Sequence, residues 1–225
     1  MNNPGFLTDF QLLGSKSRIT EFESLMVIKT LDNPTFMNGN CLLLKNPPTN
    51  KNKGDIENLF LQNFDKSVLR SHVSIAWECA HGNLANFIAD GYEYNHNSVL
   101  TIKPKDFIKP LKTNSKITVK QFNESIHWQQ WIQNEVDERP ETITKSNFEV
   151  FIEKPADFYR ELSEKGIGGF FGAFIENRLV GSVGLYIFDG IGRFQQVSTL
   201  KEYRRNYICN TLLEFIISKK KQRWI

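Results

Sequence analysis

Two adjacent arginines, Arg204 and Arg205, lie between a stretch with the apolar alternation of a strand and one with the apolar spacing of a helix. The whole segment reads FQQVSTLKEYRRNYICNTLLEFII over residues 194–217. The N–H groups in the first turn of a helix have no partners within it, and the helix dipole favours negative charge there. Arginines in the approach add charge-assisted hydrogen bonds to an anion. This order of strand, loop and helix predicts a pyrophosphate-binding site.

The composition is that of a folded protein with a mild positive charge. The 225 residues suit one large domain or two small ones, and 40% hydrophobic residues with 18 Phe suffice for a core. Much of the net charge of +3 comes from a basic cluster formed by Lys219, Lys220, Lys221 and Arg223. We interpret this cluster as the last turn of a helix, where cations face the negative dipole end. Because few aromatic residues are interleaved with it, a nucleic-acid or membrane patch is the weaker alternative.

The cysteines and the N-terminal stretch point to a reducing compartment. Cys41, Cys79 and Cys209 are odd in number and widely spaced, which favours neither a disulfide framework nor a metal site. We expect them to be small buried hydrophobes. The sequence begins MNNPGFLTDFQLLGSK, without a basic n-region or an apolar h-region, and no later run reaches the length of a membrane span. These features predict a cytoplasmic protein with no membrane partner and no bound metal.

A change in pattern divides the chain into two halves. Prolines and lysines interrupt the apolar periodicity in KPKDFIKPLKTN, so we predict a first half at residues 1–105, a linker at 106–114 and a second half at 115–225. In the first half, Asp55 is the expected N-cap of a helix, and Gly91 is expected to end a short helix over 84–89. The strands expected there are 24–30, 40–45, 72–77 and 92–102.

The second half is predicted to contain a strand, two helices, three strands and a closing helix, in that order. A helix over 124–136 is expected to bury Ile126, Trp131 and Ile132, and a second helix over 156–165 to end at Gly166. The strands expected in this half are 116–119, 170–175, 179–188 and 193–199, and the closing helix carries Ile208, Leu212, Phe215 and Ile216 at helical spacing. Because the last three strands are joined by short turns, they must be antiparallel neighbours. The predicted class is α/β of the α+β type, with a mixed, mostly antiparallel sheet flanked by helices.

This order and the segment after the last strand resemble the GNAT superfamily of acyl-CoA-dependent N-acyltransferases. In that superfamily the loop has the pattern Q/R-x-x-G-x-G/A, and Arg204 to Cys209, preceded by VSTLKEY, occupy it here. Tyr207 and Cys209 stand at the two glycine positions. The resemblance implies acetyl-CoA as co-substrate, with contacts from Val197, Thr199, Arg204, Arg205, Asn206, Tyr207, Ile208, Cys209 and Asn210. A side chain at Tyr207 is expected to crowd the pyrophosphate unless its ring points away.

The first half carries a weaker form of the same resemblance. Residues 83–101, NLANFIADGYEYNHNSVLT, match the late signature of the superfamily through Phe87, Gly91, Tyr92 and Glu93. This implies a degenerate GNAT-like half in a tandem arrangement. The alternative is an unrelated α/β cap domain. The second half ends where the fifth strand of the superfamily is expected, so its fourth strand is predicted to be an open edge. Truncation, cover by the first half and cover by a second subunit in a homodimer stay open.

Acyl transfer needs a neutral amine and a stabilised oxyanion. By resemblance, the backbone N–H near Val197 serves the oxyanion, and His127 and Glu202 are weak candidates for the base. Each has a structural alternative: His127 as a half-buried structural residue, and Glu202 as a solvated acid paired with Arg204 or Arg205. The primary hypothesis is an N-acetyltransferase acting on a small-molecule or peptide amine. The rival hypothesis is a non-catalytic interaction module that keeps the fold.

Overall fold

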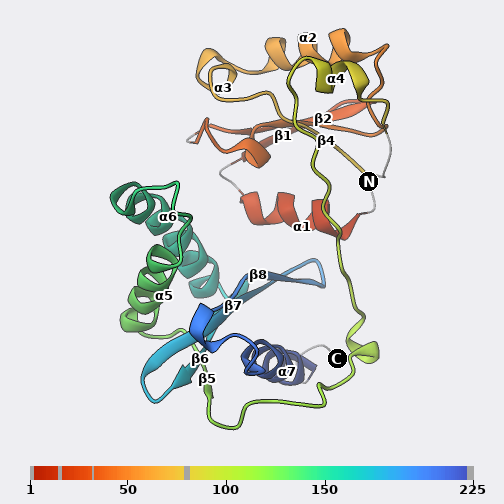
Figure 1. Cartoon of the computed structure of the whole chain (residues 1–225). Coiled ribbons are helices and arrows are strands. Elements are labelled where there is room, and N and C mark those ends of the chain that lie inside the picture. The colour runs from red at the N-terminus through yellow and green to blue at the C-terminus, as the bar shows by residue number, and fades with distance from the viewer. Residues whose placement is uncertain (1–2, 15–16, 32, 79–81, 222–225) are drawn as a thin grey trace. The chain divides into compact units, whose positions relative to one another are not determined.

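The computed structural model describes residues 3–14, 17–31, 33–78 and 82–221, and the chain divides into two compact units. The N-terminal unit comprises Met1–Leu100 and the C-terminal unit Thr101–Ile225. Each unit contains a four-stranded, largely antiparallel sheet with helices on both faces (Figure 1). The predicted class, a mixed and mostly antiparallel α/β protein of the α+β type, is therefore confirmed.

The N-terminal unit has the strand order β1-β2-β3-β4. Its strands are β1 (Ser17–Glu21), β2 (Leu25–Thr30), β3 (Cys41–Leu44) and β4 (Ile75–Trp77). Its helices are α1 (Pro4–Leu13), α2 (Lys53–Asn63), α3 (Lys66–Leu69) and α4 (Ala85–Ala89). All pairs are antiparallel except β3 with β4, which is parallel.

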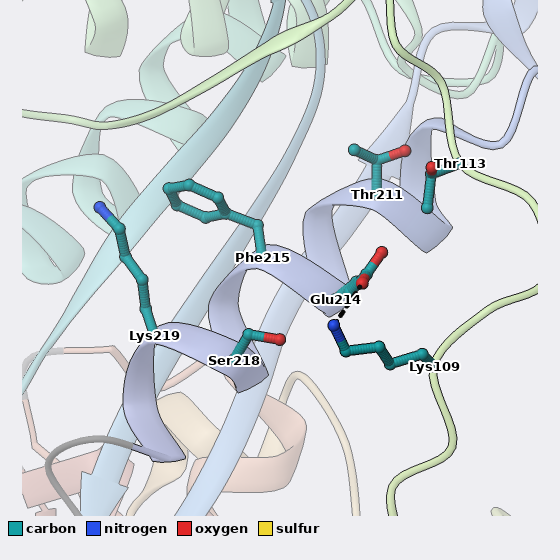
Figure 2. A pocket seen from close by; sticks show the side chains of 7 residues that line it. All are labelled: Lys109, Thr113, Thr211, Glu214, Phe215, Ser218 and Lys219. Atoms are coloured by element: carbon teal, nitrogen blue, oxygen red, sulfur yellow. Dashed lines mark ion pairs between the residues drawn. The ribbon is translucent and has the colours of Figure 1, made fainter.

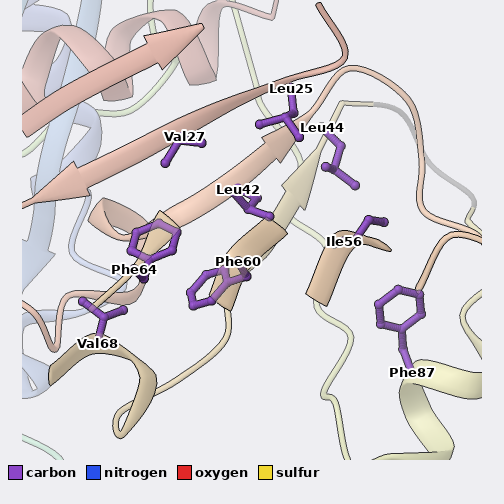
Figure 3. Close-up of a cluster of buried hydrophobic side chains, with 9 residues drawn as sticks. All are labelled: Leu25, Val27, Leu42, Leu44, Ile56, Phe60, Phe64, Val68 and Phe87. Atoms are coloured by element: carbon purple, nitrogen blue, oxygen red, sulfur yellow. The ribbon is translucent and has the colours of Figure 1, made fainter. Parts of the chain in front are cut away.

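Alternation along the central strands gives this sheet two apolar faces. Leu42 and Leu44 of β3 point to the side covered by α2, α3 and α4, where they meet Phe60 and Phe87 (Figure 3). Cys41 and Leu43 point to the other side, which α1 covers. Burial of each large apolar side chain contributes roughly 1.5–3 kcal/mol to the stability of the fold. Because β3 buries side chains on both faces of the sheet, it is the centre of the core of this unit.

The cysteine predictions can be compared with two of the three residues. Cys41 is buried, as expected, and burial, with a smaller effect from Asp9, raises the pKa of its thiol to about 12. Cys209 is only half-buried, and burial raises the pKa of its thiol as well. Cys79 lies outside the described residues.

The C-terminal unit has the strand order β5-β6-β7-β8, so β8 is an edge strand of the sheet that the described residues form. Its strands are β5 (Thr118–Gln121), β6 (Gly168–Ile175), β7 (Arg178–Phe188) and β8 (Ile191–Thr199). Its helices are α5 (Ser125–Asp137), α6 (Lys145–Glu164) and α7 (Ile208–Lys221). All three strand pairs are antiparallel, as the short turns predicted.

Two different apolar layers cover the two faces of this sheet. On one face, α7 packs Ile208, Leu212 and Ile216 against strand residues, as its helical spacing predicted. On the other, α5 and α6 contribute an aromatic cluster in which the ring of Trp131 lies 5.2 Å from that of Phe170. Ile208, in the first turn of α7, is thereby buried against the sheet to which β8 belongs.

Several local predictions were wrong for identifiable reasons. Residues 92–102 form no strand. Asp55 is not the N-cap of α2, because the N-cap is Asn52, three residues earlier, and Asp55 lies in the first turn. The helix predicted over 156–165 begins at Lys145 and contains Pro155, a residue that usually interrupts helices. Ile126 is 49% exposed instead of buried.

Helix α1 and strand β1 had no counterpart in the sequence predictions. Helix α1 starts with an Asn3 side-chain cap and carries the Pro-Gly pair in its first turn, a pair that by itself favours a turn. Strand β1 is mostly exposed and lacks apolar alternation, so its extended form depends on pairing with β2.

Candidate functional site

An irregularity in β8 marks the start of the candidate site. Ser198 pairs with Ser182 of β7 and Gln195 pairs with Gly184, so Gln196 and Val197 together lie opposite one residue. This is a β-bulge, and Gln196 adopts a left-handed φ of 47°. Bulges bend a strand, leave its extra residue out of the ladder and are common beside active sites.

After the bulge, alternate residues of β8 direct their backbone groups away from β7. Leu200 N donates to Val180 O at 3.0 Å, so the backbone groups of Ser198 and Leu200 face β7. In an antiparallel ladder the intervening residues, Val197 and Thr199, face the other way. The carbonyl of Thr199 does accept a hydrogen bond from outside the ladder, from Arg204 Nε at 3.1 Å. The edge of β8 therefore presents backbone groups at Val197 and Thr199, two of the predicted acetyl-CoA contacts.

The loop between β8 and α7 contains two residues in the left-handed region, which favours glycine. Arg205 has φ 64° and Tyr207 has φ 59°. Tyr207 immediately precedes α7, and its carbonyl accepts from Thr211 N at 3.0 Å, the first bond of the helix. Tyr207 is 44% exposed, and the centroid of its ring lies 5.7 Å from Lys112 Nζ. Tyr207 thus holds, as a non-glycine residue, a backbone conformation that glycine adopts freely.

The two arginines of this loop have different roles. Arg204 Nη2 lies 2.8 Å from Glu138 Oε2 at the end of α5, and the other oxygen of Glu138 accepts from Lys201 N at 2.6 Å. The Arg204 side chain is therefore engaged in an ion pair that holds the loop in place. Arg205 is exposed. Of the two, Arg205 is the cation available to a bound anion.

Residues 112–114, which precede β5, form hydrogen bonds to the same loop and to the first turn of α7. Asn114 Nδ2 donates to Asn206 O at 2.9 Å, and Asn114 N donates to Thr211 Oγ1 at 2.8 Å. Asn210 Nδ2 donates to Lys112 O at 3.4 Å. The side chain of Asn206 also donates to two carbonyls within the loop. Residues that were predicted to form a linker therefore position the loop and the first turn of α7.

A hollow of about 430 Å³ lies beside this stretch of β8. Its lining comes from the end of α5, the end of β8 and the following loop. The lining residues are Asn134, Glu135, Glu138, Val197, Ser198, Thr199, Leu200 and Arg204. The structure thus brings together three predicted coenzyme contacts, Val197, Thr199 and Arg204, with two carboxylates that the sequence had not singled out.

Glu135 is one of the two carboxylates of this hollow, with Glu138, that sequence reasoning missed. Burial, and to a lesser extent the negative charge of Glu138, raises the pKa of its carboxyl. Glu135 and Glu138 are three residues apart, so a helix puts them on one face. That spacing was visible in the sequence, but nothing in it showed that the face borders β8.

Tyr159 of α6 links this region to the bulge. Burial raises the pKa of its hydroxyl; a hydrogen bond with the Gln196 side chain and the positive charge of Arg193 act in the opposite direction. The negative charge of Glu135 raises it further. Its ring stacks on Tyr186 at 5.6 Å, and Tyr186 OH donates to the Tyr159 carbonyl at 3.0 Å. The side chain of Tyr159 is thus held by the Tyr186 ring and by Gln196 of the bulge.

The two side chains proposed from sequence as bases lie elsewhere. Glu202 is paired with Arg178 of β7 at 2.7 Å, which confirms an exposed, paired acid but not the predicted partner. His127 is 7% exposed and packs against Phe122 and Phe174, at 5.6 and 5.1 Å between ring centroids. It is thus more deeply buried than the predicted half-buried residue. Neither residue lines the hollow beside β8.

A second hollow of about 430 Å³ runs along the outer side of α7 (Figure 2). It is closed on one side by the 109–113 segment, where Lys109 Nζ lies 3.5 Å from Glu214 Oε1. It contains none of the predicted site residues.

Among the described residues, no group of three or more His, Cys, Asp or Glu side chains is arranged to hold a metal ion. None of the helices described is both long and apolar enough to span a bilayer.

No protein-family model and no curated protein matches the chain, but solved structures do. A functionally unknown conserved protein from Staphylococcus epidermidis ATCC 12228 is 13% identical, with a TM-score of 0.63 over 94% of this chain and 82% of that chain. A GCN5-related N-acetyltransferase from Kribbella flavida is also 13% identical, with a TM-score of 0.55 over 96% of this chain and 79% of that chain. This chain has the GNAT fold.

The predicted resemblance is confirmed at the level of the fold. The tandem arrangement, the degenerate first half and the individual coenzyme contacts stay predictions.

Proposed function

We propose that this protein is an N-acetyltransferase that transfers the acetyl group of acetyl-CoA to an amine by direct attack. The observation that carries the proposal is the bulge at Gln196 and Val197, followed by the loop into α7. In the proposed complex, the outward backbone groups of Val197 and Thr199 pair with the amides of pantetheine. The thioester then lies at the bulge, beside the hollow.

The residues present fit the pyrophosphate of acetyl-CoA at the start of α7. The N–H groups of Ile208, Cys209 and Asn210 belong to the first helical turn and have no helical acceptor. Arg205 adds a positive charge from its exposed position in the loop. The left-handed φ of Tyr207 keeps its backbone in the form that glycine usually supplies, and its exposed ring lies near Lys112, beside the loop.

One observation favours the rival function, a non-catalytic module with this fold. Tyr207 places a side chain where a glycine lets the backbone approach phosphate closely. In this alternative, coenzyme binding is weak or absent. The two functions therefore make opposite predictions for acetyl-CoA binding.

Thermal unfolding with increasing acetyl-CoA separates them. Ligand at about a hundred times its dissociation constant stabilises a protein by roughly 2.7 kcal/mol, which gives a clear rise in melting temperature. Arg205→Ala should weaken this shift, whereas Lys145→Ala, which removes an exposed charge on α6, should not. A wild-type protein with no shift at millimolar acetyl-CoA would contradict the proposal and support the non-catalytic module.

A further inference from the structure

We propose that Glu135 is the catalytic base, and that the acceptor is a primary amine that enters the hollow beside β8 as its ammonium ion. This rests on the proposed acetyl transfer and adds to it the proton acceptor and the charge class of the substrate. Neither His127 nor Glu202, the two candidates suggested by the sequence, borders this hollow.

Glu135 lies where an acceptor amine could reach the proposed thioester. Glu135 lines the same hollow as Val197, Ser198 and Thr199, the stretch of β8 that follows directly on the extra residue of the bulge. If the thioester lies along the outward groups of Val197 and Thr199, an amine in the hollow approaches its carbonyl carbon from the side of α5. The volume of about 430 Å³ is within the range of small-molecule sites.

Glu135 and its neighbour Glu138 differ in their hydrogen-bond partners. Both carboxylate oxygens of Glu138 are engaged, one by Lys201 N and the other by Arg204. Within the described part of the chain, no side chain or backbone N–H donates a hydrogen bond to Glu135. A carboxylate without an internal donor can accept a proton from a ligand without first breaking another bond.

The electrostatic surroundings of Glu135 favour its role as a base. The charged and titratable groups around Glu135 are Glu138 on its own helix, Tyr159 on α6 and Arg204 in the loop. The positive charge of Arg193 on β8 acts on Tyr159. Arg204 is neutralised by Glu138, and Glu138 in turn adds to the effect of burial in raising the pKa of Glu135. A carboxylate with raised proton affinity is a better base towards an ammonium ion than an exposed one.

The proposed step balances without any further reactant. Glu135 takes one proton from the ammonium ion, and the nitrogen lone pair of the neutral amine attacks the thioester carbon to form a C–N bond. The carbonyl electrons move to oxygen and return as the C–S bond breaks. The nitrogen loses its second proton, the CoA thiolate gains one, and Glu135 releases its proton to solvent. The products are the N-acetyl amine, CoA and one proton.

The test compares Glu135→Gln with wild type for both coenzyme binding and transfer. The probes are acetyl-CoA with alkyl amines such as cadaverine, lysine and spermidine, and with aniline, which is already unprotonated at neutral pH. Glu135→Gln should bind acetyl-CoA as wild type does but transfer to alkyl amines about 10²–10⁴-fold more slowly. The difference in transfer rate between Glu135→Gln and wild type should be smaller with aniline as the acceptor. The fall in transfer rate that wild type shows on the acidic side of its pH profile should be absent from Glu135→Gln. Glu135→Asp should recover part of the rate.

Asp137→Asn is the matched control, because Asp137 lies on the same helix but is exposed and bonded to Gln133. It should behave as wild type in both assays. A Glu135→Gln variant with wild-type rates and pH profile would overturn the assignment of Glu135 alone. A wild-type protein that binds acetyl-CoA but acetylates none of these amines would overturn the transfer and this inference together. A wild type that does not bind acetyl-CoA contradicts the coenzyme proposal itself.

Discussion

Arg204 Nη2 lies 2.8 Å from Glu138 Oε2, and this ion pair ties the loop before α7 to the end of α5. The same carboxylate accepts a hydrogen bond from Lys201 N and raises the pKa of Glu135 through its charge. Glu138 therefore connects the proposed pyrophosphate loop to the hollow where we place the acceptor. The connection gives the first of four predictions.

Replacement of Glu138 by Ala should weaken acetyl-CoA binding more than it weakens the fold. The pair is partly exposed, so its contribution to the free energy of unfolding is about 0.2–1 kcal/mol. Without it, the loop loses the contact that fixes its entry into α7, and the coenzyme must then order it. Titration calorimetry measures the affinity and urea unfolding the stability. Glu138→Gln, which keeps an acceptor for Lys201 N–H, should lose less affinity; equal affinity in both variants and wild type would contradict the role of the pair.

Replacement of Tyr207 by Gly should raise acetyl-CoA affinity. A non-glycine residue in the left-handed region costs on the order of 1–3 kcal/mol, which glycine avoids, although glycine loses roughly 0.5–1 kcal/mol in backbone entropy on folding. We therefore expect the free energy of unfolding to change little or to rise. Tyr207→Ala removes the ring but keeps Cβ, so it separates the steric effect of the ring from that of the backbone. A glycine variant with both lower affinity and lower stability would refute this account.

The bulge in β8 predicts a strong difference between two substitutions at Gln196. Its φ of 47° is poorly compatible with a β-branched side chain, so Gln196→Val should lower the free energy of unfolding by about 1–3 kcal/mol. Gln196→Gly should be tolerated much better, because glycine adopts this conformation freely. Gln196 is exposed, so neither change removes core packing. Urea unfolding of both variants is the measurement, and equal stability would argue against the bulge.

The raised pKa of Glu135 predicts that Glu135→Gln is more stable than wild type at neutral pH. Between the ordinary pKa of a glutamate and the raised value, the native state binds more protons than the unfolded state. The contribution of Glu135 to stability is thus present at low pH and is lost as pH rises through the raised pKa. The melting-temperature advantage of the glutamine variant should be largest near neutral pH and should diminish on acidification. An advantage that is absent, or that grows at acidic pH, would contradict the desolvated carboxylate.

The sequence predicted the C-terminal unit better than the N-terminal one. In β6, β7 and α7, apolar periodicity and short turns agree, and Ile208, Leu212 and Ile216 are buried as their spacing required. In the N-terminal unit, β1 has no apolar alternation and takes its form from its neighbour. The predicted strand over 92–102 failed because its apolar residues, such as Leu100, have no strand partner and are exposed.

By itself the sequence determined the order of elements after residue 115, the antiparallel pairing of the last three strands and the arginine-bearing loop before a helix. These follow from periodicity, turn length and local residue types, which act over a few positions of the chain. Tertiary structure alone decided the bulge at Gln196, the left-handed backbone at Tyr207, the occupation of Arg204 by Glu138 and the place of Glu135 beside β8. Each of these depends on how strands register and which helix face meets which edge of the sheet. Such contacts join residues far apart in sequence, where local patterns carry no information.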